Sequence, residues 1–221
     1  MNTTNAPSLE KRVENALLWI RAHQERFWTV TGVVVLTVLF GVFAMQQHER
    51  QQDEAWTQLG AVQSSIIQNQ FDAAKKSLAD WNTRYGTTSV KTYADFLKAD
   101  LLYKTSDYAT AAQMYAQLSI TGRPAVVQPL ALSAQISAEE MAGKIADARA
   151  TAQRFIDKYP DHFFAASAYL SQARLAELSG DKPAAAAIYE RFVILYPQSP
   201  WTASIKTRLQ MSPAPASPLA H

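Results

Sequence analysis

The chain of 221 residues is long enough to bury a hydrophobic core and too short for several large domains. Its net charge of +2 provides no basic face broad enough for nucleic acid, so a nucleic-acid partner is not expected. It contains no cysteine, which excludes disulfides, thiolate metal sites, a cysteine nucleophile and a lipid-modified N-terminal cysteine.

Residues 1–26 are predicted to form a cytoplasmic leader helix. Ser8 is a suitable N-cap residue. Four apolar residues follow it at helical spacing: Leu9, Val13, Leu17 and Ile20. We expect this helix to extend the membrane segment that comes next; resting on the membrane surface or binding a cytosolic partner are the alternatives.

Residues 27–45 are predicted to form a single transmembrane helix. This stretch has 19 residues and no charge, and at about 1.5 Å per residue it spans a bilayer core of about 30 Å. Trp28 lies at one end, as an interfacial aromatic residue does. A cleaved signal peptide is the alternative, because residues 42–44 resemble a weak cleavage site, but the apolar run is longer than the core of an ordinary signal peptide.

The charges around this segment predict its orientation. Only Arg50 follows it closely, whereas four basic residues precede it: Lys11, Arg12, Arg21 and Arg26. Positive charge favours the cytoplasmic side. The N-terminus is therefore expected in the cytoplasm, and the chain beyond a short connector at residues 46–54 is expected on the other side of the membrane.

The remainder of the chain contains an internal repeat with a step of 37 residues. Alanine recurs in one register, small or turn-forming residues in a second, and large apolar residues in a third. The registers are Ala74, Ala111, Ala148 and Ala185; Asn69, Ser106, Gly143 and Gly180; and Trp81, Leu118, Phe155 and Phe192. The recurrence of all three registers predicts four copies of one structural unit.

Each unit is predicted to be a helical hairpin, with the small residue at the turn and the alanine where the two helices cross closely. A single hairpin cannot bury both of its faces, so the hairpins must stack. We therefore expect an all-α solenoid at residues 55–210, with units starting at 55, 92, 129 and 166. Residues 199–210 are expected to add a capping helix with Trp201, Ile205 and Leu209 on its inner face, before a disordered tail at 211–221.

The units resemble the tetratricopeptide repeat, whose usual period is about 34 residues. The last unit matches its small, turn, aromatic and proline positions with Ala173, Gly180, Ala185, Tyr189 and Pro197. The second unit does so with Ala99, Ala111 and Tyr115. The first and third units fit the pattern less well.

This resemblance implies a concave surface lined by the first helix of each hairpin. The positions that it places there are Trp56, Leu59, Gln63, Tyr93, Phe96, Asp100, Tyr103, Leu130, Leu170 and Arg174. Aromatic residues at such a surface suit polypeptide ligands, because they offer contact area with few rotatable bonds. The residues predicted to bind a partner are Trp56, Tyr93, Phe96, Asp100, Tyr103 and Arg174, and of these we expect Tyr93 and Tyr103 to be partly exposed. Packing of these side chains between neighbouring hairpins is the alternative.

No pattern in the sequence predicts a catalytic, cofactor-binding or metal site, or a small-molecule substrate. The four histidines are scattered, and the glycines form no phosphate-binding loop. Glu139 and Glu140 are adjacent on a predicted helix, so their side chains diverge and cannot act as a facing acid and base. We expect both to lie on the solvated surface.

The order of leader, anchor, connector and repeats resembles the YfgM-like tetratricopeptide family, the ancillary subunits of the bacterial Sec translocon. The residues that carry the likeness are Val13, Glu14, Gly32, Gly41, His48, Tyr93, Ala111 and Ala112. The resemblance implies a non-enzymatic adaptor or chaperone of the bacterial inner membrane with a periplasmic repeat domain. Its implied partners are translocon subunits, a periplasmic chaperone, and unfolded or nascent polypeptide.

A structural scaffold of another cell-envelope complex, for secretion, outer-membrane assembly or division, is the alternative function. The ends of the last two units also resemble outer-membrane assembly lipoproteins and the Tol-Pal-associated coordinator protein. Those proteins would carry a lipidated cysteine, or a cleaved signal with a coiled coil, and the sequence predicts neither.

Overall fold

The computed structural model describes residues 24–211, with side chains from residue 33 to residue 210. The predicted leader helix up to residue 23 and the predicted tail from residue 212 lie outside the described residues. Within them the chain forms nine helices and no strand. It divides into two compact units that meet between Asp53 and Glu54. We refer to the part from Glu54 onward as the repeat domain.

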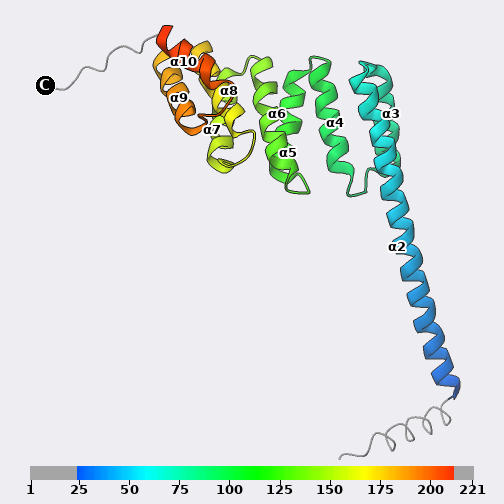
Figure 1. Cartoon of the computed structure of the whole chain (residues 1–221). Helices are drawn as coiled ribbons and strands as arrows, with labels where there is room; N and C mark the ends of the chain where they lie inside the picture. The colour runs from blue at the N-terminus through cyan, green and yellow to red at the C-terminus, as the bar shows by residue number, and fades with distance from the viewer. Residues whose placement is uncertain (1–23, 212–221) are drawn as a thin grey trace, which may run out of the picture. The chain divides into compact units, whose positions relative to one another are not determined.

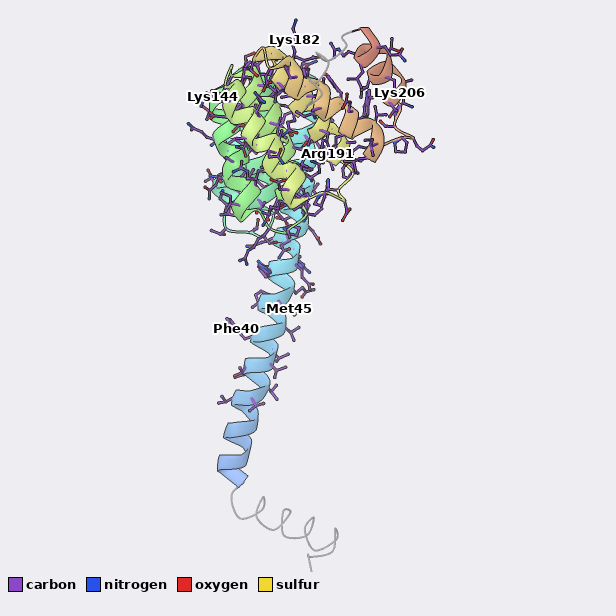
Figure 2. All side chains as sticks on the ribbon, turned by 90° about the vertical axis from the view of Figure 1, so that its left-hand side faces the viewer. Phe40, Met45, Lys144, Lys182, Arg191 and Lys206 are labelled. Carbon is purple, nitrogen blue, oxygen red and sulfur yellow. The ribbon has the colours of Figure 1, made fainter. Side chains whose placement is uncertain are left out.

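Helix α2 (Gln24–Ile67) contributes to both units. In the first unit its apolar side chains between Val33 and Met45 are exposed, and Phe40 and Met45 project from the helix (Figure 2). None of the helices, over the residues described, is long and apolar enough to cross a membrane. The predicted transmembrane segment begins at Phe27, and the side chains of its residues 27–32 lie outside those that the structure describes.

The repeat domain is a row of antiparallel helical hairpins (Figure 1). Residues 54–67 of α2 pair with α3 (Phe71–Tyr85), and a shorter helix, α10 (Thr202–Met211), follows the last hairpin. Three more hairpins lie between them: α4 (Lys91–Lys104) with α5 (Tyr108–Thr121), α6 (Val127–Met141) with α7 (Ile145–Lys158), and α8 (Ala165–Leu178) with α9 (Lys182–Leu195). The predicted all-α repeat fold is confirmed.

The turn inside each hairpin has the same backbone conformation. In each hairpin the small or turn-forming residue of the repeat lies at this turn and has a positive φ. The values are 59° at Asn69, 67° at Ser106, 74° at Gly143 and 80° at Gly180. The next residue donates its backbone N–H to a carbonyl five residues earlier, as Asp181 does to Ala176 at 2.9 Å. This bond satisfies a helix-end carbonyl, so the turn both ends one helix and begins the next.

The alanine and apolar registers form the core. All four alanines are buried, as are the four large residues, with Phe155 and Phe192 fully enclosed. Trp81 also donates its indole N–H to the carbonyl of Ala55 at 2.8 Å, which fixes α3 against α2. Because the alanine leaves room for close helix crossing and the aromatic ring fills the space beyond it, one sequence pattern builds every hairpin.

The first helices of successive hairpins form one layer. Between Phe71 and Met211, α4 contacts α6 and α6 contacts α8, whereas the second helices of neighbouring hairpins do not contact each other. The first-helix layer is therefore the inner, concave side of the repeat domain, as the resemblance to tetratricopeptide repeats implied.

The capping helix differs in one respect from the prediction. Ile205 is buried and Leu209 packs against the core, but Trp201 lies in the turn before α10 and is about half exposed. The register of Trp201 is occupied by buried Val90, directly before α4, and by buried Val127, the first residue of α6. Trp201 has no further hairpin to cover it, so its predicted place on the inner face is wrong.

The positive φ values predict opposite effects of glycine at two turns. Gly180→Ala should lower the stability of the fold by about 1 kcal/mol, because an L side chain is strained in the left-handed region. Ser106→Gly should raise it by about the same amount by relieving that strain. No atom lies within 4 Å of a Cβ at Gly180, so the effect is one of backbone strain alone. Thermal unfolding of the whole chain, followed by circular dichroism, measures both changes.

Gly60→Ala is the control for the loss of glycine flexibility. Gly60 lies within helix α2 and is also free of neighbours within 4 Å. Alanine there should stabilise the helix by up to about 1 kcal/mol. A stabilising effect of Gly180→Ala would contradict the role of the left-handed turn.

Candidate binding groove

The inner face of the first helices carries the residues predicted to bind a partner. Gln63, Asp100, Ser137 and Arg174 occupy one repeat register along this face, on α2, α4, α6 and α8 in turn. We call this face the groove. Its first half is aromatic, while its second half carries charged side chains.

Trp56 and Tyr93 meet at the beginning of the groove. Their ring centroids are 4.7 Å apart, with the planes tilted by 57°. Trp56 is 45% exposed although its residue type is usually well covered, and Tyr93 is partly exposed. The pair therefore presents an aromatic surface to solvent at the position where the resemblance predicted one.

Further along the groove, toward the ends of α2 and α4, lies a hollow of about 400 Å³. It is lined by α2, α4, α5 and α6, with Gln63, Asp100, Tyr103, Lys104, Tyr115 and Ser137 as its polar residues. Of the predicted residues, it brings together Asp100 and Tyr103. The apolar parts of its wall include Ile66, Ile67 and Leu97, so the hollow combines an apolar lining with a few polar groups, as ligand sites generally do.

Asp100 and Tyr115 form the polar centre of this hollow. The Tyr115 hydroxyl donates a short hydrogen bond to the Asp100 carboxylate. Burial raises the pKa of Asp100 above its ordinary value of 3.8, although the hydrogen bond from Tyr115 and the charge of Lys104 act in the opposite direction. Burial, followed by the neighbouring Asp100 charge, also raises the pKa of Tyr115, which therefore stays protonated and remains a donor.

Phe96 and Tyr103 contribute to both the groove and the packing between helices. Phe96 meets the Tyr115 ring edge to face at 5.4 Å, and Tyr103 meets Tyr108 in the same way at 5.2 Å. Both side chains are only partly exposed. Part of each ring therefore stabilises the α4–α5 hairpin, and the remainder is available at the surface.

Two predicted groove positions are not part of the exposed aromatic surface. Leu59 is 3% exposed and belongs to the core between α2 and α3, so its expected place on the surface is wrong. Arg174 is exposed and pairs with Glu140 of α6. It lies on α8, separated from the aromatic residues of α4 by α6, so the structure does not bring it together with Trp56 or Tyr93.

Glu139 is the main polar residue that sequence reasoning misplaced. It is 7% exposed rather than solvated, and one of its carboxylate oxygens, Oε2, has no hydrogen-bond partner. Its Oε1 accepts from Gln135 at 2.6 Å, and Gln135 also reaches Thr151 of α7 at 3.4 Å. Glu140 is only partly exposed and is paired with Arg174. Two adjacent glutamates on a helix predict a solvated surface. The repeat register predicts burial instead, because Glu139 aligns with the apolar residues Leu102 and Ala176.

A second hollow of about 640 Å³ lies between α3 and α4, on a different face of α4 from the groove. Lys75, Asp95 and Lys98 line it. The same registers at the next interface, between α5 and α6, are taken by buried Ala112, Leu132 and Gln135. The interface between α3 and α4 stays open because it carries charged side chains. The interface between α5 and α6 is closed by smaller or less polar side chains at the same positions.

The comparisons with known proteins agree with this architecture. The tetratricopeptide repeat family matches residues 96–163 and 133–200, and the two matches are offset by 37 residues, the step of the internal repeat. Residues 96–200 therefore match tetratricopeptide repeats in sequence and in fold, and proteins with such repeats are generally non-catalytic scaffolds that bind proteins. No curated protein matches the chain. Over the residues with described side chains, no cluster of three or more acidic or histidine residues could hold a metal ion.

The raised pKa of Asp100 predicts that removing its charge increases the stability of the fold, and that the increase depends on pH. The folded chain holds this proton more tightly than the unfolded chain, so the stability linked to Asp100 is fully present below the unfolded pKa of 3.8 and is lost as the pH rises through the folded value. Asp100→Asn keeps an oxygen to accept the Tyr115 hydrogen bond. We expect it to raise the melting temperature at neutral pH and to have little effect near about pH 3, where the aspartate is protonated.

Asp95→Asn provides the matched control on the same helix. Asp95 pairs with Lys91 at the surface at 2.6 Å, and such a pair contributes about 0–1 kcal/mol. Asp95→Asn should therefore not raise the melting temperature at neutral pH. If both variants raised the melting temperature equally, net charge rather than the burial of Asp100 would govern the effect.

Proposed function

We propose that this protein is a membrane-anchored, non-enzymatic adaptor that binds segments of partner proteins in the groove. The observation that carries the proposal is the exposed aromatic pair Trp56 and Tyr93, on the same helices as the hollow that contains Asp100 and Tyr103. Aromatic side chains in a concave, partly apolar surface are typical anchors for polypeptide.

The proposed anchor is the uncharged segment at residues 27–45, with the N-terminus in the cytoplasm and the repeat domain in the periplasm of a bacterial inner membrane. Its support is the length of the apolar run and the excess of basic residues before it. The architecture as a whole resembles ancillary subunits of the Sec translocon. We therefore propose translocon subunits, a periplasmic chaperone and emerging polypeptide as the partners.

The groove is suited to extended or partly unfolded chains. Trp56 and Tyr93 offer apolar contact area. The Asp100 carboxylate, which already accepts from Tyr115, can accept hydrogen bonds from a backbone N–H or a basic side chain of the partner. Loss of one aromatic anchor from such a surface typically weakens binding by about tenfold or more. A scaffold for one folded partner in another envelope complex is the second candidate, favoured by the Arg174–Glu140 pair in the second half of the groove.

Photocrosslinking in cells tests the proposal. A photoreactive residue at Tyr93 or Tyr103 should capture translocon subunits, a periplasmic chaperone or a range of secreted chains, and Trp56→Ala should reduce this capture by about tenfold. The control position is Lys76, which is exposed on the second helix α3. Equal capture from Lys76 would exclude the groove, and capture of one envelope protein alone would favour the scaffold.

A further inference from the structure

Both edges of the repeat domain expose large apolar side chains: Ile67, Met141 and Leu178 end first helices at the tight turns, and a longer row lies at the opposite edge. We call it the loop edge, because it is formed by the connections from each second helix to the next first helix, residues 86–90, 122–126, 159–164 and 196–201 (Figure 1). Its exposed apolar residues are Ile120, Val126, Phe163, Ile194, Leu195 and Trp201. Val126 and Phe163 are one repeat apart and occupy the same register in two successive connections.

Phe163 is held in its outward position. It is 73% exposed, while the ring of its neighbour Phe164 packs inward against the core at 4.0 Å from it. The His162 ring centroid lies 4.5 Å from that of Phe163 and 5.6 Å from that of Phe164, and His162 accepts the backbone N–H of Phe164 at 3.2 Å. The loop therefore presents Phe163 on a supported structure, which is how an interfacial aromatic anchor is presented.

The chain enters the repeat domain at this same edge. The bond from Trp81, in the last turns of α3, to Ala55 places the beginning of the domain level with the end of α3. The repeat register of Val126 and Phe163 corresponds to Gln52 in the first hairpin. Gln52 follows the proposed anchor by only a few residues, so along the chain the first position of this register comes directly after the proposed membrane span.

The charges at the loop edge permit contact with a lipid surface. Arg84, Arg123 and Lys158 lie in or beside its loops, against Asp157 and Asp161. The excess of basic charge is small, so apolar insertion rather than attraction to anionic lipid would dominate. Lys144 and Lys182 stand instead at the opposite end of the helices, where the tight turns lie (Figure 2).

We propose that the loop edge rests on the bilayer that holds the anchor, with Phe163 and Trp201 inserted at the level of the lipid headgroups. The ligand of this surface is the lipid interface itself, for which exposed Phe and Trp side chains at loop tips are suited. This inference rests on the proposed membrane anchor. It adds that the repeat domain lies against the membrane instead of being free on its connector.

The absence of cysteine allows a direct test with single labels on the whole chain. Phe163→Cys carries an environment-sensitive fluorophore at the loop edge, and Phe40→Cys carries it in the anchor. Leu178→Cys is the matched control, because Leu178 is similarly apolar and 60% exposed but ends helix α8 at the opposite edge. The labelled chains are reconstituted into vesicles of phosphatidylethanolamine and phosphatidylglycerol, with or without nitroxide groups on the acyl chains.

Nitroxide lipids should quench the label at 163 strongly and the label at 178 little or not at all. Quenching at 40 without quenching at 163 would overturn the inference and leave the anchor standing. Quenching at 163 without quenching at 40 would support the lipid-binding edge and refute the anchor. Equal quenching at 163 and 178 would show attraction by the label alone, and a blue shift at 163 without quenching would show that a protein surface covers this edge; both outcomes overturn the proposal.

Discussion

The left-handed turn inside each hairpin is the constraint on which the rest of the repeat domain depends. A residue with positive φ at the same register fixes where the first helix ends and the second begins. Since the second helices then begin 37 residues apart, at Phe71, Tyr108, Ile145 and Lys182, the buried alanine register falls at the same crossing in every hairpin. The groove exists because this identical geometry sets the first helices side by side.

The sequence could predict this framework because its signals are local and repeated. A turn residue, an alanine and a large apolar residue at fixed offsets require no knowledge of distant contacts. Trp56 and Tyr93 could be placed by the same reasoning, as the register identifies the face of the helix to which they belong. Positions that depend on one particular neighbour could not be predicted. Leu59 shares a register with Phe96 but belongs to the core, and Glu139 is buried beside Gln135, which itself bonds to Thr151 of α7.

The first two hairpins pack less closely against each other than the second and third do. Lys75 and Lys98 project between α3 and α4 at positions where the next interface buries alanine and glutamine. Charged side chains cannot be enclosed without partners, so this interface remains hydrated and open. The first hairpin therefore has more freedom to shift relative to the second than later hairpins have relative to each other. Because Trp56 and Tyr93 lie on these two hairpins, the aromatic pair at the beginning of the groove can adapt to its ligand more readily than the second half can.

Asp100 is the residue that most favours the proposed binding role of the hollow over a packing defect. Gln63, Ser137 and Arg174 share its register and carry no carboxylate, so the repeat itself does not require one there. Burial raises the pKa of Asp100, which means that its charge opposes folding at neutral pH. A group that costs stability and contributes nothing to the repeat pattern is typical of functional sites. A ligand that donates hydrogen bonds or carries positive charge would recover this cost on binding, so the unfavourable charge of the free protein becomes a source of affinity in the complex.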